Sequence, residues 1–130
     1  MRTCREPTFL PLTLSTVRAT PDPTTRAVHA TARRADSAAA ECWAALLAGC
    51  DAPGKHQLPL RLRELSDAAT PHATEGHRGK IDQARTRIEE ALTDRDGEDF
   101  AEAFIGYDQA VATALARAHN RQETGDRTWV

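Results

Sequence analysis

The sequence predicts an all-α fold, a bundle of three to four helices, and three observations lead to this prediction. Alanine, the strongest helix former, is very common in the 130 residues. The alternation LPLRLREL at residues 58–65 would suit a strand, but a lone strand would lack a partner elsewhere in the chain. Apolar residues recur at helical spacing in four segments: roughly 24–50, 58–69, 80–93 and 98–119.

The first of these helices has the longest apolar stripe in the chain. Thr24 or Thr25 is the predicted N-cap, and the turn residues from Gly49 to Gly54 end the helix. At 1.5 Å per residue the helix is nearly 40 Å long, which exceeds what the shorter helices can cover. The stripe residues follow a spacing of four and three: Val28, Ala32, Ala35, Ala39, Cys42, Leu46 and Cys50.

The second helix, residues 58–69, is short, and Pro59 suits its first turn. Residues 70–79 have the composition of a turn, and the third helix follows them and ends near Thr93. The apolar face of the second helix contains Leu58, Leu62, Leu65 and Ala69, and that of the third contains Ile81, Ala84, Ile88, Ala91 and Leu92.

The last helix, residues 98–119, has the clearest apolar stripe. Gly97 suits the end of the preceding helix, and Asp96 or Asp99 suits the N-cap of this one. The short polar turn predicts that the third and fourth helices form an antiparallel hairpin. The stripe consists of Phe100, Phe104, Tyr107, Val111, Ala114 or Leu115, and Ala118.

The ends of the chain lack such a stripe. The apolar stretch FLPLTLSTV is short and broken by Pro11, which argues against a signal peptide. Leu10, Leu12 and Leu14 alternate, as in a strand packed on a surface. We therefore expect three parts: a flexible or irregular, non-helical arm (1–23), a helical domain (24–120) and a frayed tail (121–130).

The cysteines indicate packing and not a metal or redox site. Cys42 and Cys50 are eight residues apart, or about 12 Å along a helix, which is too far for a disulfide or a shared zinc ion. Three cysteines at scattered spacing are typical of reduced thiols. We expect a cytoplasmic protein, and the excess of arginine over lysine suits a bacterium with a high-GC genome.

No catalytic or metal-binding motif is complete. His72 and His77 are five residues apart and flanked by glycines, so we interpret them as exposed loop residues. The segment DRDGED lacks the spacing of a calcium loop. The carboxylates that could act as acid or base are interpreted as ordinary solvated charges: Glu89, Glu90, Glu102 and Asp108. We expect no enzyme activity, no cofactor and no metal.

Charge is distributed unevenly along the chain. Residues 1–87 have a net charge of +4 and residues 88–130 a net charge of −6, so the two parts can attract each other within one fold or between subunits. Basic residues of the second and third helices can gather into a patch that would bind nucleic acid: Arg61, Arg63, Arg78, Lys80, Arg85 and Arg87.

The favoured function is protein–protein interaction without chemistry, either self-association or the binding of a regulatory partner. Because the first helix is longer than its neighbours, a homodimer would bury the surplus of its stripe. The predicted contact residues are Trp43, Leu47, Ile105 and Gly106. Gly106 is notable because a glycine inside a helix is costly and can allow another helix to approach closely. The alternative is a nucleic-acid-associated accessory protein that uses the arginine patch. We expect no association with membranes.

Overall fold

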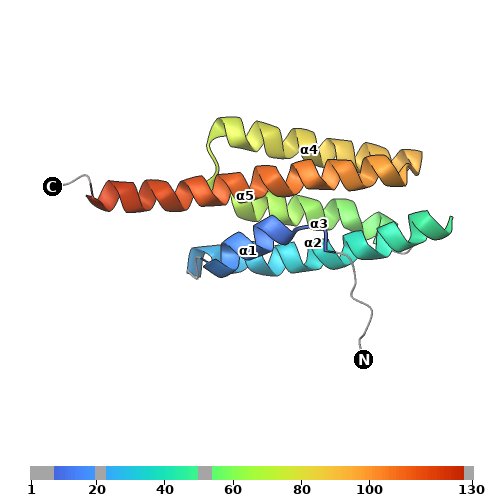
Figure 1. The fold of residues 1–130 in the computed structure, drawn as a ribbon, viewed down its shortest axis with the longest axis horizontal. Helices are drawn as coiled ribbons and strands as arrows, with labels where there is room; N and C mark the ends of the chain where they lie inside the picture. Colours follow the sequence, from blue (N-terminus) through green and yellow to red (C-terminus); the bar gives the residue numbers. More distant parts are fainter. Residues whose placement is uncertain (1–7, 20–22, 50–53, 128–130) are drawn as a thin grey trace, which may run out of the picture.

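The fold is all-α, as predicted. The computed structural model describes residues 8–19, 23–49 and 54–127 (Figure 1). Within them, the α-helices and one short 3₁₀-helix are α1 (Pro11–Ala19), α2 (Pro23–Ala48), α3 (Gly54–Ala69), η1 (Thr70–His72), α4 (Glu75–Asp94) and α5 (Gly97–Arg127). In this part of the chain no helix is both long and apolar enough to cross a membrane.

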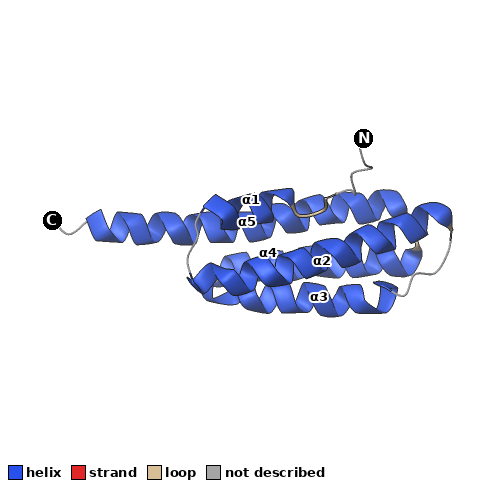
Figure 2. Ribbon diagram, turned by 90° about the horizontal axis from the view of Figure 1, so that it is seen from below, coloured by secondary structure: helices blue, strands red, loops and turns tan. Residues whose placement is uncertain are grey.

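Two antiparallel hairpins form the body of the molecule. Helix α2 packs along α3, and α4 packs along α5, so the predicted C-terminal hairpin is confirmed. The hairpins lie against each other, and α1 rests on α2 and α5 (Figure 2). The C-terminal turns of α5 project beyond the other helices (Figure 1).

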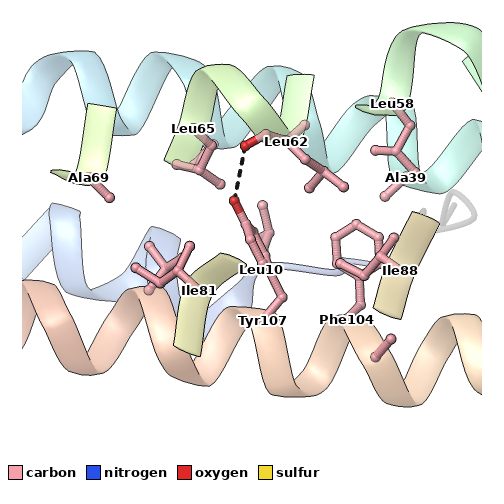
Figure 3. Close-up of a cluster of buried hydrophobic side chains, with 14 of the residues drawn as sticks. Leu10, Ala39, Leu58, Leu62, Leu65, Ala69, Ile81, Ile88, Phe104 and Tyr107 are labelled. Carbon is pink, nitrogen blue, oxygen red and sulfur yellow. Dashed lines mark hydrogen bonds between the residues drawn. The ribbon is translucent and has the colours of Figure 1, made fainter. Parts of the chain in front are cut away.

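The predicted stripes face the core. All of the following are buried: Val28, Ala32, Ala35, Ala39 and Cys42 on α2, Leu58, Leu62, Leu65 and Ala69 on α3, Ile81, Ile88, Ala91 and Leu92 on α4, and Phe100, Phe104, Tyr107, Val111 and Leu115 on α5. Cys42 packs in this core as predicted, whereas Cys50 lies outside the described residues. Figure 3 shows the leucines of α3 opposite the aromatic rings of α5.

The prediction of a non-helical arm is wrong for residues 11–19, which form α1. Two carboxylates from distant helices cap this helix. Asp36 of α2 accepts the backbone N–H of Phe9 and of Leu10, at 2.7 and 3.0 Å. Asp108 of α5 accepts those of Leu12 and Thr13, at 3.0 and 2.8 Å. The N–H groups that a helix start leaves without partners are therefore satisfied by tertiary contacts, which gives a fifth helix.

Several predicted helix ends are also wrong. Helix α2 begins at Pro23, so Thr24 and Thr25 lie inside it and do not precede it. Helix α3 begins at Gly54, one turn earlier than predicted, and Pro59 lies in its interior. Helix α5 continues to Arg127, beyond the predicted end at residue 119.

The turn between α4 and α5 does not use its glycine as the helix stop. Arg95 adopts the left-handed conformation (φ 58°) that ends α4. The backbone N–H groups of Arg95 and Asp96 then donate to the last carbonyls of the helix, in the pattern of a Schellman motif. Gly97 is the first residue of α5. Asp96 caps that helix, because its side chain accepts the backbone N–H of Asp99. Of the two predicted N-caps, Asp96 and Asp99, the first is therefore the one that the structure uses.

Candidate functional site

An open groove of about 430 Å³ runs between α4 and α5. Its floor and walls come from both helices of the hairpin: His77, Lys80, Gln83, Ala84 and Arg87 on α4, and Gly106, Gln109, Ala110, Thr113 and Arg117 on α5. Three of these lining residues, Ala84, Gly106 and Ala110, are small. A Cβ atom added at Gly106 would meet nothing within 4 Å, so the glycine leaves open space that a larger residue would fill.

The spacing of the helix explains which α5 residues face this groove. Gly106, Gln109, Thr113 and Arg117 line the groove and follow one another at intervals of three and four residues. Glu102 lies four residues before Gly106 and extends the same exposed stripe of α5, outside the groove. The core stripe with Phe104, Tyr107 and Val111 occupies the opposite side. Between Glu102 and Arg117 the exposed stripe contains no charged residue.

Charges are separated along the hairpin. Lys80, Arg87 and Arg117 line the groove, and no acidic residue lines it among those described. The end of the hairpin near the turn is acidic, and its exposed carboxylates are Glu90, Asp94, Asp96, Glu98, Asp99 and Glu102. The two groups meet where Arg87 approaches Asp99 at 3.9 Å, with both side chains at least half exposed. Such an exposed pair contributes little to stability and leaves both groups available to a partner.

His77 lies in the first turn of α4 and not in a loop as predicted. Thr74 caps the helix, because its side chain accepts the backbone N–H of His77 at 3.2 Å. The Nδ1 atom of His77 is buried and finds no hydrogen-bond partner among the described residues. His72 belongs to η1, so the two histidines lie on different elements. No group of three or more His, Cys, Asp or Glu side chains in the described ranges could hold a metal ion.

The six residues of the predicted arginine patch do not lie together in the structure. Lys80 and Arg87 share the groove with Arg117, which the sequence analysis did not include. Arg85 is largely buried and pairs with Glu89, one helical turn later, at 3.0 Å, and with Asp82 at 3.7 Å.

The remaining members of that patch lie elsewhere. Arg61 pairs with Glu64 at 3.1 Å and lines a second depression, between α2 and α3, with Arg33 and Arg34. Arg63 is exposed on α3. Arg78 reaches the carbonyl of Thr70 at 3.5 Å.

The four predicted contact residues have different positions. Trp43 is half-buried, and its ring stacks on Phe100 (6.2 Å between centroids) and meets Phe9 edge-on (5.9 Å). Leu47 is 67% exposed near the end of α2. Ile105 is 59% exposed on α5 but does not line the groove, whereas Gly106, the next residue, does.

Two buried polar groups have structural partners that account for them. Asp108 is only 3% exposed and caps α1, so the interpretation of this carboxylate as a solvated charge is wrong. The Tyr107 hydroxyl donates to the carbonyl oxygen of Leu62 at 3.2 Å and lies 2.9 Å from Ser66 Oγ (Figure 3). Burial raises the pKa of Tyr107 well above its ordinary value, so the hydroxyl stays protonated and holds α5 to α3.

Family models, curated proteins and solved structures provide no match for this chain. The groove between α4 and α5 therefore stands on its geometry alone. Its Arg117 and Thr113 were missed from the sequence, although their spacing from Gly106 could have revealed them.

Proposed function

We propose that this protein is a non-enzymatic helical module that acts by binding another protein through the open face of the α4–α5 hairpin. One observation carries the proposal: Gly106 lines the groove with open space above it, and the next residue of α5, Ile105, is exposed although it lies outside the lining. A helix packs against another when small residues allow its backbone to approach and an aliphatic side chain loses its contact with water. The groove supplies the small residues, and Ile105 supplies an exposed aliphatic side chain one position away from its lining.

The chemistry of the lining supports binding and not catalysis. The groove has three cationic side chains and uncharged amides and hydroxyls, but no nucleophile paired with a base. Asp108 and Tyr107, the most deeply buried polar side chains nearby, already have partners in the fold. A module that recognises a helix needs no more than shape, apolar area and complementary charge.

Photochemical crosslinking tests this proposal. An Ile105→p-benzoylphenylalanine variant should form covalent protein adducts in the cells that express it, and mass spectrometry should place the adduct at the groove. The matched control is Arg63→p-benzoylphenylalanine, at an exposed position on α3. Adducts that form equally at both positions, or at neither, would contradict the proposal.

Nucleic-acid binding is the second candidate, and the cluster of Lys80, Arg87 and Arg117 favours it. The acidic end of the same hairpin argues against it, because Glu98, Asp99 and Glu102 would repel a phosphate backbone that follows the groove. Fluorescence anisotropy with labelled duplex DNA and single-stranded RNA separates the two candidates. A nucleic-acid-binding groove would lose affinity steeply with added salt and in a Lys80→Glu, Arg87→Glu variant, but not in an Arg61→Glu, Arg63→Glu variant.

A further inference from the structure

The open face of the α4–α5 hairpin has opposite charge at its two ends. Arg117 and Lys80 lie at one end. Glu98, Asp99 and Glu102 lie at the other, where Arg87 of α4 offsets part of the negative charge by pairing with Asp99. The stripe between these ends is uncharged and contains Gly106, Gln109 and Thr113. A surface of this kind is complementary to itself once one copy is turned end to end.

From this complementarity we propose that the partner in the groove is a second copy of this chain, bound with its α5 antiparallel to the first. The inference rests on the proposed function and names its partner. A twofold axis generates such a contact, because the same surface is used on both copies.

The helix spacing fixes the register of the two copies. Glu102 and Arg117 are equally far from the point between Gln109 and Ala110, and so are Gly106 and Thr113. With the twofold axis at that point, Glu102 of each copy lies opposite Arg117 of the other. The two residues are about 22 Å apart along one helix, so the charged pairs lie about 11 Å on either side of the axis.

The same register explains the small residues of the groove. Gly106 lies opposite Thr113 of the second copy. Because glycine has no side chain, it leaves room for the Thr113 side chain of the other helix. Ile105 is on the margin of this face and would lose its 59% exposure on association.

A charge-swap series tests this arrangement by sedimentation velocity and native mass spectrometry, over about 1 to 100 μM protein. The wild type should form a dimer. Glu102→Arg and Arg117→Glu should each raise the dimer Kd about tenfold or more, because twofold symmetry introduces each like-charge pair twice. The double variant should restore the dimer, since it exchanges the two charges without changing the pairing.

Matched variants separate these effects from general charge or stability effects. Arg63→Glu and Asp67→Arg make the same charge changes on the exposed side of α3 and should leave the dimer Kd unchanged. Gly106→Leu should abolish dimerisation, whereas Gly79→Leu should not, because Gly79 does not line the groove although it also lies exposed inside a helix. Circular dichroism confirms that each variant is folded.

The outcomes distinguish this inference from the proposed function. A monomeric wild type at the highest concentration, or a dimer that ignores the charge swap, would overturn the antiparallel dimer. If such a protein still crosslinks from position 105 to a different protein, the proposed function stands with another partner. Absence of both dimer and crosslink would overturn both.

Discussion

The carboxylate of Asp108 on α5 accepts the backbone N–H of Thr13 on α1 at 2.8 Å, although the two residues are 95 positions apart in the sequence. The Thr13 hydroxyl donates to the backbone carbonyl of Asp108 at 3.3 Å, so the two residues contact each other in both directions. Together with Asp36, this contact decides where α1 begins and fixes it to the rest of the molecule.

Removing the Asp108 carboxylate should release α1. The Asp108→Ala variant leaves the N–H groups of Leu12 and Thr13 without acceptors, which should cost about 2 to 3 kcal/mol. Hydrogen exchange should show the loss of protection in α1 first. Asp67→Ala, at an exposed site on α3, is the control and should change neither stability nor exchange. Unchanged exchange of Leu12 and Thr13 in the Asp108 variant would show that the cap does not stabilise α1.

Strong alkali should destabilise the fold through Tyr107, the only tyrosine in the chain. Burial raises the pKa of Tyr107 in the folded state, so the unfolded state loses its proton first. The contribution is fully present below the unfolded pKa of about 10 and is lost as the pH rises above it, by at most about 1.4 kcal/mol per pH unit. Denaturant titrations as a function of pH measure this slope, and tyrosinate absorbance reports the ionisation.

The Tyr107→Phe variant is the control for that titration. It should reduce the free energy of unfolding by about 1 kcal/mol at neutral pH, because the hydrogen bond to Leu62 is lost. The part of the alkaline slope that comes from tyrosine should disappear with it. An equally steep slope in this variant would assign the alkaline loss to other groups.

Enlarging the small residues of α2 should be harmful only on its buried side. Ala35 is fully buried and Ala44 is exposed on the same helix. Ala35→Leu should therefore destabilise the protein by about 1 to 3 kcal/mol through overpacking. Ala44→Leu should change stability by less than about 0.5 kcal/mol. Thermal unfolding compares the two, and equal effects would show that α2 does not pack through its alanine face.

Replacing glycine with alanine at position 106 should stabilise the isolated chain. Gly106 lies inside α5 with no atom close enough to clash with a Cβ, so Gly106→Ala should add about 0.5 to 1 kcal/mol through helix propensity. Gly79→Ala on α4 should add a similar amount. The unfolding must be measured at low protein concentration, where association does not contribute. A destabilised Gly106→Ala chain would mean that the glycine is needed within the monomer.

The core helices could be predicted from the sequence because their pattern is local. The stripe from Val28 to Cys42 on α2 and that from Phe100 to Leu115 on α5 contain enough apolar residues at helical spacing to identify the buried side. The N-cap at Asp96 could also be predicted, since its side chain accepts the backbone N–H of a residue only three positions later in the sequence.

Helix α1 could not be predicted in this way because its determinants are distant. Its buried residues are Thr13 and Val17, with the buried Leu10 just before the helix, and the polar Thr13 conceals the helical period. Its N-terminal N–H groups find their hydrogen-bond acceptors in Asp36 and Asp108. These two residues are far from α1 in the sequence and come close to it only in the folded chain. The groove has the same origin: Lys80 and Arg117 become neighbours only through the register of α4 against α5.

The capping of α1 by Asp108 also affects the order in which the protein can assemble. During synthesis α1 leaves the ribosome before every other helix described here, while the carboxylate that caps it lies in the last helix. Until residue 108 is available, the start of α1 has only Asp36 to satisfy it, and α5 is absent from the surface on which it rests. We therefore expect α1 to dock late, so that the first helix made is among the last to take its place.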